Sequence, residues 1–166
     1  MEKVNDVYLA LGSNLGDPKQ NIIQCIAFIE KKVGRVCKKG RLYSNQAIGF
    51  SSDSLFLNTV LKVQSQLTPD ELLLACKSIE EEMGRQPKTG NTYTSRIIDI
   101  DIILFNMLIY NKEELNIPHL ESTKRDFVLL PLGDIDQNLV FPHTKLTVYQ
   151  HIELLSGARQ LSTIDF

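Results

Sequence analysis

Residues 96–105 have the sequence RIIDIDIILF, in which Asp99 and Asp101 interrupt a run of β-branched and other apolar side chains. Such a run predicts a buried strand. Because side chains alternate between the two faces of a strand, both aspartates point the same way, with their Cα atoms about 6.5–7 Å apart. Two carboxylates on one face of a buried strand repel each other and are costly to desolvate.

Divalent cations would offset this electrostatic cost of the two acids. A pair of Mg²⁺ ions about 3.5–4 Å apart fits the spacing of Asp99 and Asp101. Arg96 lies three residues before Asp99, and its guanidinium suggests a phosphate ligand for those metals. The alternative is a polar strand face that neighbouring Lys or Arg side chains neutralise without a metal.

The chain before this stretch alternates strand and helix signals. Strands are predicted over residues 7–12, 36–43, 56–63 and 96–105. One helix is predicted to begin at Asp17 and Pro18, and another at Thr68, where Glu71 is placed for a capping box. The resulting order, βαββαβ, is that of the ferredoxin-like α+β sandwich.

The remainder of the chain is predicted to extend this sandwich. We expect a hairpin near residues 107–117 and a helical C-terminal third, with Pro131 and Pro142 as boundary residues. No role is assigned to the last ~20 residues. The length favours one domain, residues 1–166.

Composition excludes several classes of function. The net charge of −2 argues against a general nucleic-acid binder, and no apolar run approaches the ~20 residues that span a bilayer. The cysteines lack metal-ligand spacing, and Cys25 and Cys76 fall within helical apolar patterns, which predicts buried free thiols. We therefore expect a cytoplasmic monomer whose partners are neither nucleic acid nor membrane.

Several short motifs occur together in a specific order. They are LGSNLG at residues 11–16, IGF at 48–50, FLN at 56–58, GR at 84–85, RIIDID at 96–101, PH at 118–119, RDF at 125–127 and LLPL at 129–132. Each is weak alone, but their joint occurrence is specific. From its first strand to about Pro142, the chain resembles the family of 6-hydroxymethyl-7,8-dihydropterin pyrophosphokinases.

The resemblance implies a fold and a reaction. The fold is the ferredoxin-like sandwich, and the reaction moves the diphosphoryl group of ATP to the hydroxymethyl oxygen of 6-hydroxymethyl-7,8-dihydropterin, releasing AMP in folate biosynthesis. ATP and the pterin are the implied partners, and two Mg²⁺ ions are the implied cofactors. The alternative is a non-catalytic ferredoxin-like nucleic-acid or ligand-binding module, against which the acidic strand and the net charge argue.

The resemblance also implies roles for individual residues. The catalytic group is Arg85, Arg96, Asp99 and Asp101, of which Asp99 and Asp101 bind metal. The nucleotide-binding group is Lys77, Glu80, Arg85, Arg96, Ile102, His119 and Arg125. The pterin-binding group is Asn45, Ile48, Phe56, Asn58 and Phe127, where two aromatic rings would stack on the pterin and the Asn58 amide would bind its edge.

Some of these residues also have a purely structural interpretation. Lys77 and Glu80 could form an i,i+3 surface ion pair, and Phe56 and Phe127 could be core residues. Asn14, in the turn after the first strand, is expected to be structural rather than catalytic.

The segment between the two arginines departs from the family pattern. Pro87, Tyr93 and Ser95 stand where the family often has Arg, Trp and Pro. We expect looser or slower closure of this loop, with the metal ligands unaffected. Residues 44–54 and 85–95 are both expected to become ordered only with both substrates bound.

Overall fold

The computed structural model describes residues 3–46, 55–85, 96–155 and 161–166. Its strands within these ranges are β1 (Asn5–Ser13), β2 (Gly34–Lys39), β3 (Leu42–Gln46), β4 (Leu55–Ser65), β5 (Asp99–Phe105), β6 (Tyr110–Lys112), β7 (Leu115–Ile117) and β8 (Ser162–Ile164). Its helices are α1 (Pro18–Lys32), α2 (Pro69–Glu82), the 3₁₀ turn η1 (Ser122–Lys124), α3 (Asp126–Ile135) and α4 (Val148–Leu154).

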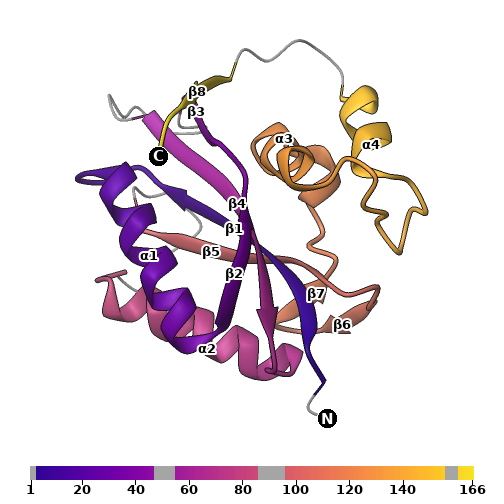
Figure 1. Ribbon diagram of the computed structural model, residues 1–166, viewed down its shortest axis with the longest axis horizontal. Coiled ribbons are helices and arrows are strands. Elements are labelled where there is room, and N and C mark those ends of the chain that lie inside the picture. The colour runs from indigo at the N-terminus through magenta and orange to yellow at the C-terminus, as the bar shows by residue number, and fades with distance from the viewer. Residues whose placement is uncertain (1–2, 47–54, 86–95, 156–160) are drawn as a thin grey trace.

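One antiparallel sheet organises the molecule (Figure 1). Its strands follow the spatial order β5-β1-β4-β3-β8, and β2 also pairs with β4. When β2 and β3 are taken as two halves of one strand, the chain order from β1 to β5 is βαββαβ. The predicted ferredoxin-like α+β sandwich is therefore confirmed, and β6 and β7 form the predicted hairpin.

The two faces of the sheet are covered by different helices (Figure 1). On one face, α1 and α2 bury Ile29 and Ile79 against Leu9 and Leu11 of β1. On the other face, α3 packs with α4 in a second core that includes alternate residues of β1, Tyr8 and Ala10. The alternation of side chains along β1 thus divides the core into two layers. No helix in the described ranges is long and apolar enough to cross a membrane.

The two main helices begin at the residues that the sequence predicts. The Asp17 carboxylate accepts a hydrogen bond from the Gln20 N–H at 3.1 Å. Thr68 and Glu71 form a complete capping box, in which the Glu71 carboxylate accepts from the Thr68 N–H at 2.8 Å. These contacts satisfy N–H groups that a helix leaves unpaired at its start. Cys25 and Cys76 are buried free thiols, as predicted.

The predicted strand over residues 36–43 is broken into β2 and β3 at Gly40. A Cβ atom at Gly40 would lie 2.4 Å from the carbonyl oxygen of Pro131 in α3. The Gly40 N–H donates a hydrogen bond to the carbonyl oxygen of Val60 in β4 at 2.9 Å. Because α3 approaches the backbone so closely here, residue 40 has no room for a side chain and must be glycine.

Two features of the C-terminal region differ from the prediction. Pro131 lies inside α3 rather than at its boundary, and Pro142 lies outside the helices. A proline removes one hydrogen bond from a helix, but the buried Leu129 and Leu132 on either side hold α3 against the sheet. The last residues form β8, which pairs with β3 and which the sequence did not predict.

Candidate functional site

The two acids of β5 lie on one face of the strand. The burial pattern alternates, with Asp99 and Asp101 half-buried and Ile100 and Ile102 buried towards α1 and α2. The acids therefore share the face that carries α3 and α4, as the sequence predicts from the strand period. The side chain of Ile102, an expected nucleotide-binding residue, lies in the core on the opposite face.

Asp99 is bound by both of the predicted arginines. Its Oδ1 lies 2.9 Å from the Arg85 guanidinium, and its Oδ2 lies 2.9 Å from the Arg96 guanidinium. In the protein alone, arginine neighbours therefore neutralise this carboxylate, as the alternative interpretation of the strand holds. Each carboxylate oxygen has a second lone pair, so these contacts leave Asp99 able to accept further partners.

Glu80 of α2 continues this chain of charges. It is 7 % exposed, accepts a hydrogen bond from the Ile100 N–H at 2.8 Å and forms an ion pair with Arg85. Burial raises the pKa of Glu80 to about 7, although the Ile100 hydrogen bond and the Arg85 charge oppose this shift. Glu80 thus connects the backbone of β5 to Arg85 and holds that guanidinium beside Asp99.

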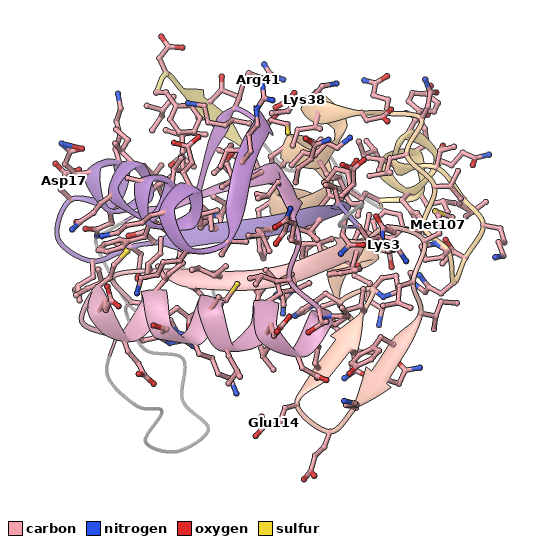
Figure 2. The ribbon with its side chains drawn as sticks, turned by 60° about the horizontal axis from the view of Figure 1, so that its bottom comes forward. Lys3, Asp17, Lys38, Arg41, Met107 and Glu114 are labelled. Atoms are coloured by element: carbon pink, nitrogen blue, oxygen red, sulfur yellow. The ribbon has the colours of Figure 1, made fainter. Side chains whose placement is uncertain are left out.

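Lys77 does not join the cluster around Asp99. Its ammonium pairs with Glu114 at 3.2 Å, in the turn between β6 and β7 that Figure 2 shows projecting from the molecule. The structural alternative for these two residues, an i,i+3 surface ion pair, is therefore wrong, because Lys77 and Glu80 have other partners. Helix geometry allows residues three apart to meet, but burial of Glu80 turns its carboxylate towards Arg85 instead.

Asp101 has a different environment from Asp99. Among the described side chains, its ion-pair partner is His119, whose Nε2 lies 3.9 Å from Oδ1. Burial and the neighbouring Asp99 charge raise the pKa of Asp101, whereas His119 and Arg125 lower it. Asp101 is therefore the less neutralised acid of the pair, with two expected nucleotide-binding residues close to it.

The donor set around these acids fits magnesium bound together with phosphate. No three His, Cys, Asp or Glu side chains within the described ranges form a complete metal cage. Mg²⁺ is commonly bound by one or two carboxylates, with water and substrate phosphates completing an octahedron. Two carboxylates on one strand face supply such a partial set.

Asn14 and Ser13 hold the segment that carries Arg96. The Asn14 side chain accepts from the Arg96 N–H at 2.7 Å, and the Asn14 N–H donates to the Arg96 carbonyl at 3.1 Å. The Ser13 hydroxyl donates to the Ile97 carbonyl. Asn14 is structural, as expected, but it also positions Arg96. The turn signal at Ser13 and Asn14 was visible in the sequence, whereas its distant partner was not.

A cross-strand row joins the two halves of the candidate site. Asp99 pairs with Gly12, Gly12 with Asn58, and Asn58 with Tyr43, across β5, β1, β4 and β3. Asn58 is 8 % exposed, and a Cβ at Gly12 would lie 3.0 Å from its Oδ1. Residues directly opposite in a sheet share a face, so Asn58 and Asp99 lie on the same face with their Cα atoms two strand spacings, about 10 Å, apart.

Of the other residues expected to bind the pterin, three lie within the described part of the chain and one lies outside it. Phe56 shares the Asn58 face of β4 because the two are separated by one residue. Phe127 lies in the first turn of α3, which packs on β4, and the Arg125 guanidinium lies 5.7 Å from its ring centroid. Asn45 belongs to β3, and Ile48 lies outside the described residues. Pro87, Tyr93 and Ser95 also lie outside them, as do most residues of both loops.

An acid pair with flanking arginines, two strands from a buried amide on a ferredoxin-like sheet, has the chemistry expected of a transferase site for a phosphate-bearing substrate. The model of the 7,8-dihydro-6-hydroxymethylpterin-pyrophosphokinase family matches residues 8–137. The chain belongs to this family, which confirms the resemblance and its classification as a diphosphotransferase of folate biosynthesis.

Individual relatives agree with the family assignment. A 2-amino-4-hydroxy-6-hydroxymethyldihydropteridine pyrophosphokinase of Porphyromonas gingivalis is 41% identical over 133 residues, covering 78% of this chain and 89% of the relative. The folic acid synthesis protein fol1 of Schizosaccharomyces pombe is 37% identical over 161 residues, which span 95% of this chain but only 22% of that protein.

Solved structures support the fold. The wild-type HPPK-DHPS of Plasmodium falciparum crystallised with pteroate has a TM-score of 0.73 and 18% identity. The match covers 92% of this chain and 42% of that one. The same protein in a second wild-type crystal structure also gives a TM-score of 0.73, at 17% identity.

Proposed function

We propose that this protein catalyses the Mg²⁺-dependent transfer of diphosphate from ATP to the hydroxymethyl group of 6-hydroxymethyl-7,8-dihydropterin, with release of AMP. One observation supports this most strongly: the row that sets Asp99 and Asn58 on one sheet face, two strands apart, with their Cα atoms about 10 Å from each other. That placement suits a flat heterocycle bound at one end and a phosphate chain at the other. Family membership supports the same reaction.

Asp99 and Asp101 are the residues that would hold two Mg²⁺ ions. Bound there, the ions neutralise charge on the phosphate oxygens and lower the pKa of the attacking hydroxyl. The pair fits this task because its oxygens are hard ligands on one half-buried face. Asp101, whose pKa burial raises, would gain most from a nearby cation.

Arg85 and Arg96 would stabilise the negative charge of the phosphate chain. Their guanidinium groups lie on opposite oxygens of Asp99, so both are oriented before a ligand arrives. Glu80 forms an ion pair with Arg85, and the Asn14 side chain accepts a hydrogen bond from the Arg96 N–H. Preorganised guanidinium groups favour in-line transfer because they need little reorganisation when charge moves towards the leaving group.

Other residues would bind the two substrates. His119 and Arg125 lie on the Asp101 side, where they would contact nucleotide phosphate. Phe56 and Phe127 would stack on the pterin, and the Asn58 amide would both donate to and accept from its edge. Asn45, in β3, and Ile48 are the other residues proposed to bind the pterin. Lys77, paired with Glu114, has the least support as a nucleotide contact.

The protein is proposed to act as a single domain. Strands from both ends of the described chain, β1 and β8, belong to one sheet, which supports this organisation. A monomeric state and a cytoplasmic location are also proposed, the location on the basis of the free cysteines.

The reaction is tested by measuring AMP formation from ATP in a coupled assay. The expected result is AMP release that requires both Mg²⁺ and 6-hydroxymethyl-7,8-dihydropterin, with the pterin diphosphate as the second product. ADP formation, or AMP release independent of the pterin, would contradict the proposal. Omitting either the pterin or the magnesium provides the matched controls.

A further inference from the structure

A cluster of three polar side chains joins β3 to the last turn of α3. The Asp134 carboxylate accepts hydrogen bonds from the Tyr43 hydroxyl at 2.9 Å and from the Arg41 backbone N–H at 3.0 Å. The Arg41 guanidinium donates to Asp134 Oδ1 at 2.9 Å from Nη2, and also to the Tyr43 hydroxyl at 2.9 Å. Each of the three side chains is therefore bonded to the other two.

Tyr43 is the buried member of this cluster. It is 5 % exposed, whereas the Arg41 side chain is 64% exposed and the Asp134 side chain 18%. Burial, and then the hydrogen bond to Asp134, raise the pKa of Tyr43 to about 12, so its hydroxyl stays protonated and donates. An exposed ion pair contributes little, but a buried hydroxyl that loses its acceptor is costly. The bond between Tyr43 and Asp134 is therefore the important one.

This bond lies beside the candidate pterin site. Tyr43 is the cross-strand neighbour of Asn58, and β3 continues from Tyr43 to Asn45. Asp134 belongs to the same helix as Phe127. The close approach of Gly40 to Pro131 is a second contact between the same two segments. The cluster thus joins β3, which pairs with Asn58, to the helix that packs on β4 and carries Phe127.

We propose that Tyr43 and Asp134 are positioning residues for the pterin, an inference that rests on the proposed function. They fix β3 and α3 against each other on either side of Asn58, and they set the affinity for the pterin without touching it. Neither residue contacts the acids of β5. The nucleotide end of the site should therefore not depend on their hydrogen bond.

The chain contains a chemically matched control elsewhere. Asp70 of α2 accepts a hydrogen bond from the Tyr110 hydroxyl at 2.8 Å and one from the Lys112 ammonium at 2.7 Å. This cluster ties α2 to the β6–β7 hairpin, and Figure 2 shows the hairpin residue Glu114 and the cluster residue Arg41 on opposite sides of the molecule. Both clusters combine an aspartate, a tyrosine and a cation, but only one borders Asn58.

The test compares ligand affinities of Asp134→Ala, Tyr43→Phe, the double variant and the control Asp70→Ala with those of the wild type. Titration calorimetry measures the dissociation constant of a non-hydrolysable ATP analogue with Mg²⁺, and then that of the pterin with the analogue present. We expect each positioning variant to weaken pterin binding about 5- to 10-fold, as the loss of one hydrogen bond does. Nucleotide affinity should be unchanged, and the double variant should resemble either single one because both remove the same bond.

Three results would overturn the inference. The first is that Asp134→Ala and Tyr43→Phe bind the pterin as tightly as Asp70→Ala does. The second is that they weaken nucleotide and pterin equally, which indicates general destabilisation. The third is that the wild type binds no pterin, which refutes the proposed function itself. If Asp134→Ala does not fold, Tyr43→Phe decides the matter, because phenylalanine fills the same space without a hydroxyl.

Discussion

The two ends of the candidate site are held together by different kinds of interaction. At the β5 end, charged groups alternate through Glu80, Arg85, Asp99 and Arg96, and each contacts the next. At the β4 end, close packing dominates, with Gly12 leaving room for the buried Asn58 amide. The first end is organised by a chain of ion pairs and the second by close packing around a buried amide.

This difference separates two kinds of mutational effect. Charges at the β5 end are partly desolvated, and each depends on its neighbours, so a substitution there alters the electrostatics that the reaction needs. Groups at the β4 end bind a neutral heterocycle, so a substitution there should change its affinity and leave the chemical step less affected. The predictions for the acids, for Asn58 and for Glu80 each test one side of this division, and the one for His151 concerns a region outside the site.

The largest effect is expected for the acids. Asp101→Ala and Asp99→Ala should each lower the rate of AMP formation by at least about 10²–10³-fold, the range for removing one electrostatic stabiliser from an active site. The measurement is the Mg²⁺ dependence of the coupled assay. Turnover by either variant at the wild-type rate would remove that residue from the metal site.

The next effect concerns the amide at the opposite end. Asn58→Ala should weaken pterin binding about 10- to 100-fold, because it leaves the polar edge of the ligand without its partner. Calorimetry with the ATP analogue serves as the control, since nucleotide affinity should remain that of the wild type. Equal pterin affinity in variant and wild type would refute the assignment of Asn58.

A smaller effect is expected on stability. Glu80→Ala should reduce the free energy of unfolding by about 1–3 kcal/mol, because the buried Ile100 N–H and the Arg85 guanidinium lose their acceptor. Glu114→Ala, which removes the exposed partner of Lys77, should change it by no more than about 0.5 kcal/mol. Urea denaturation measures both. Similar values for the two variants would show that the buried charge network does not stabilise the fold.

The smallest effect is a pH dependence of the free energy of unfolding that comes from His151 in α4. Burial lowers the pKa of His151, which is 6 % exposed and bonded to Thr144, below its ordinary value of 6.5. As the pH falls through 6.5, the unfolded chain binds a proton on this imidazole before the folded protein does, so stability falls. The contribution is fully present above that pH.

His151→Gln isolates this contribution, because glutamine can still bond Thr144 but cannot take up a proton. The loss of stability between pH 7.5 and 5.5, measured by urea denaturation, should be larger for the wild type than for the variant. A loss of the same size in both would show that His151 does not titrate differently on folding.

Local patterns sufficed to predict much of the fold. Asp17 and Thr68 are caps whose partners lie three residues away, and the acids of β5 share a face because of the strand period. Such features depend on neighbours in sequence, which is why they could be predicted. The motif order likewise led to the correct family.

Features that depend on distant partners could not be predicted. The need for glycine at position 40 comes from Pro131 of α3, and the position of Arg96 depends on Asn14. Likewise, Glu80 is buried beside Arg85 because of the depth at which α2 packs on β5. These contacts exist only once the layers have assembled, and nothing in the local sequence specifies them.

The most direct test of the account is a crystal structure of the protein with Mg²⁺, a non-hydrolysable ATP analogue and the pterin. We expect magnesium coordinated by carboxylate oxygens of both Asp99 and Asp101, at about 2.0–2.1 Å, with phosphate oxygens completing the octahedron. The opposite result is a complex in which the nucleotide and its magnesium lie elsewhere, while Arg85, Arg96 and His119 remain the only partners of the two acids.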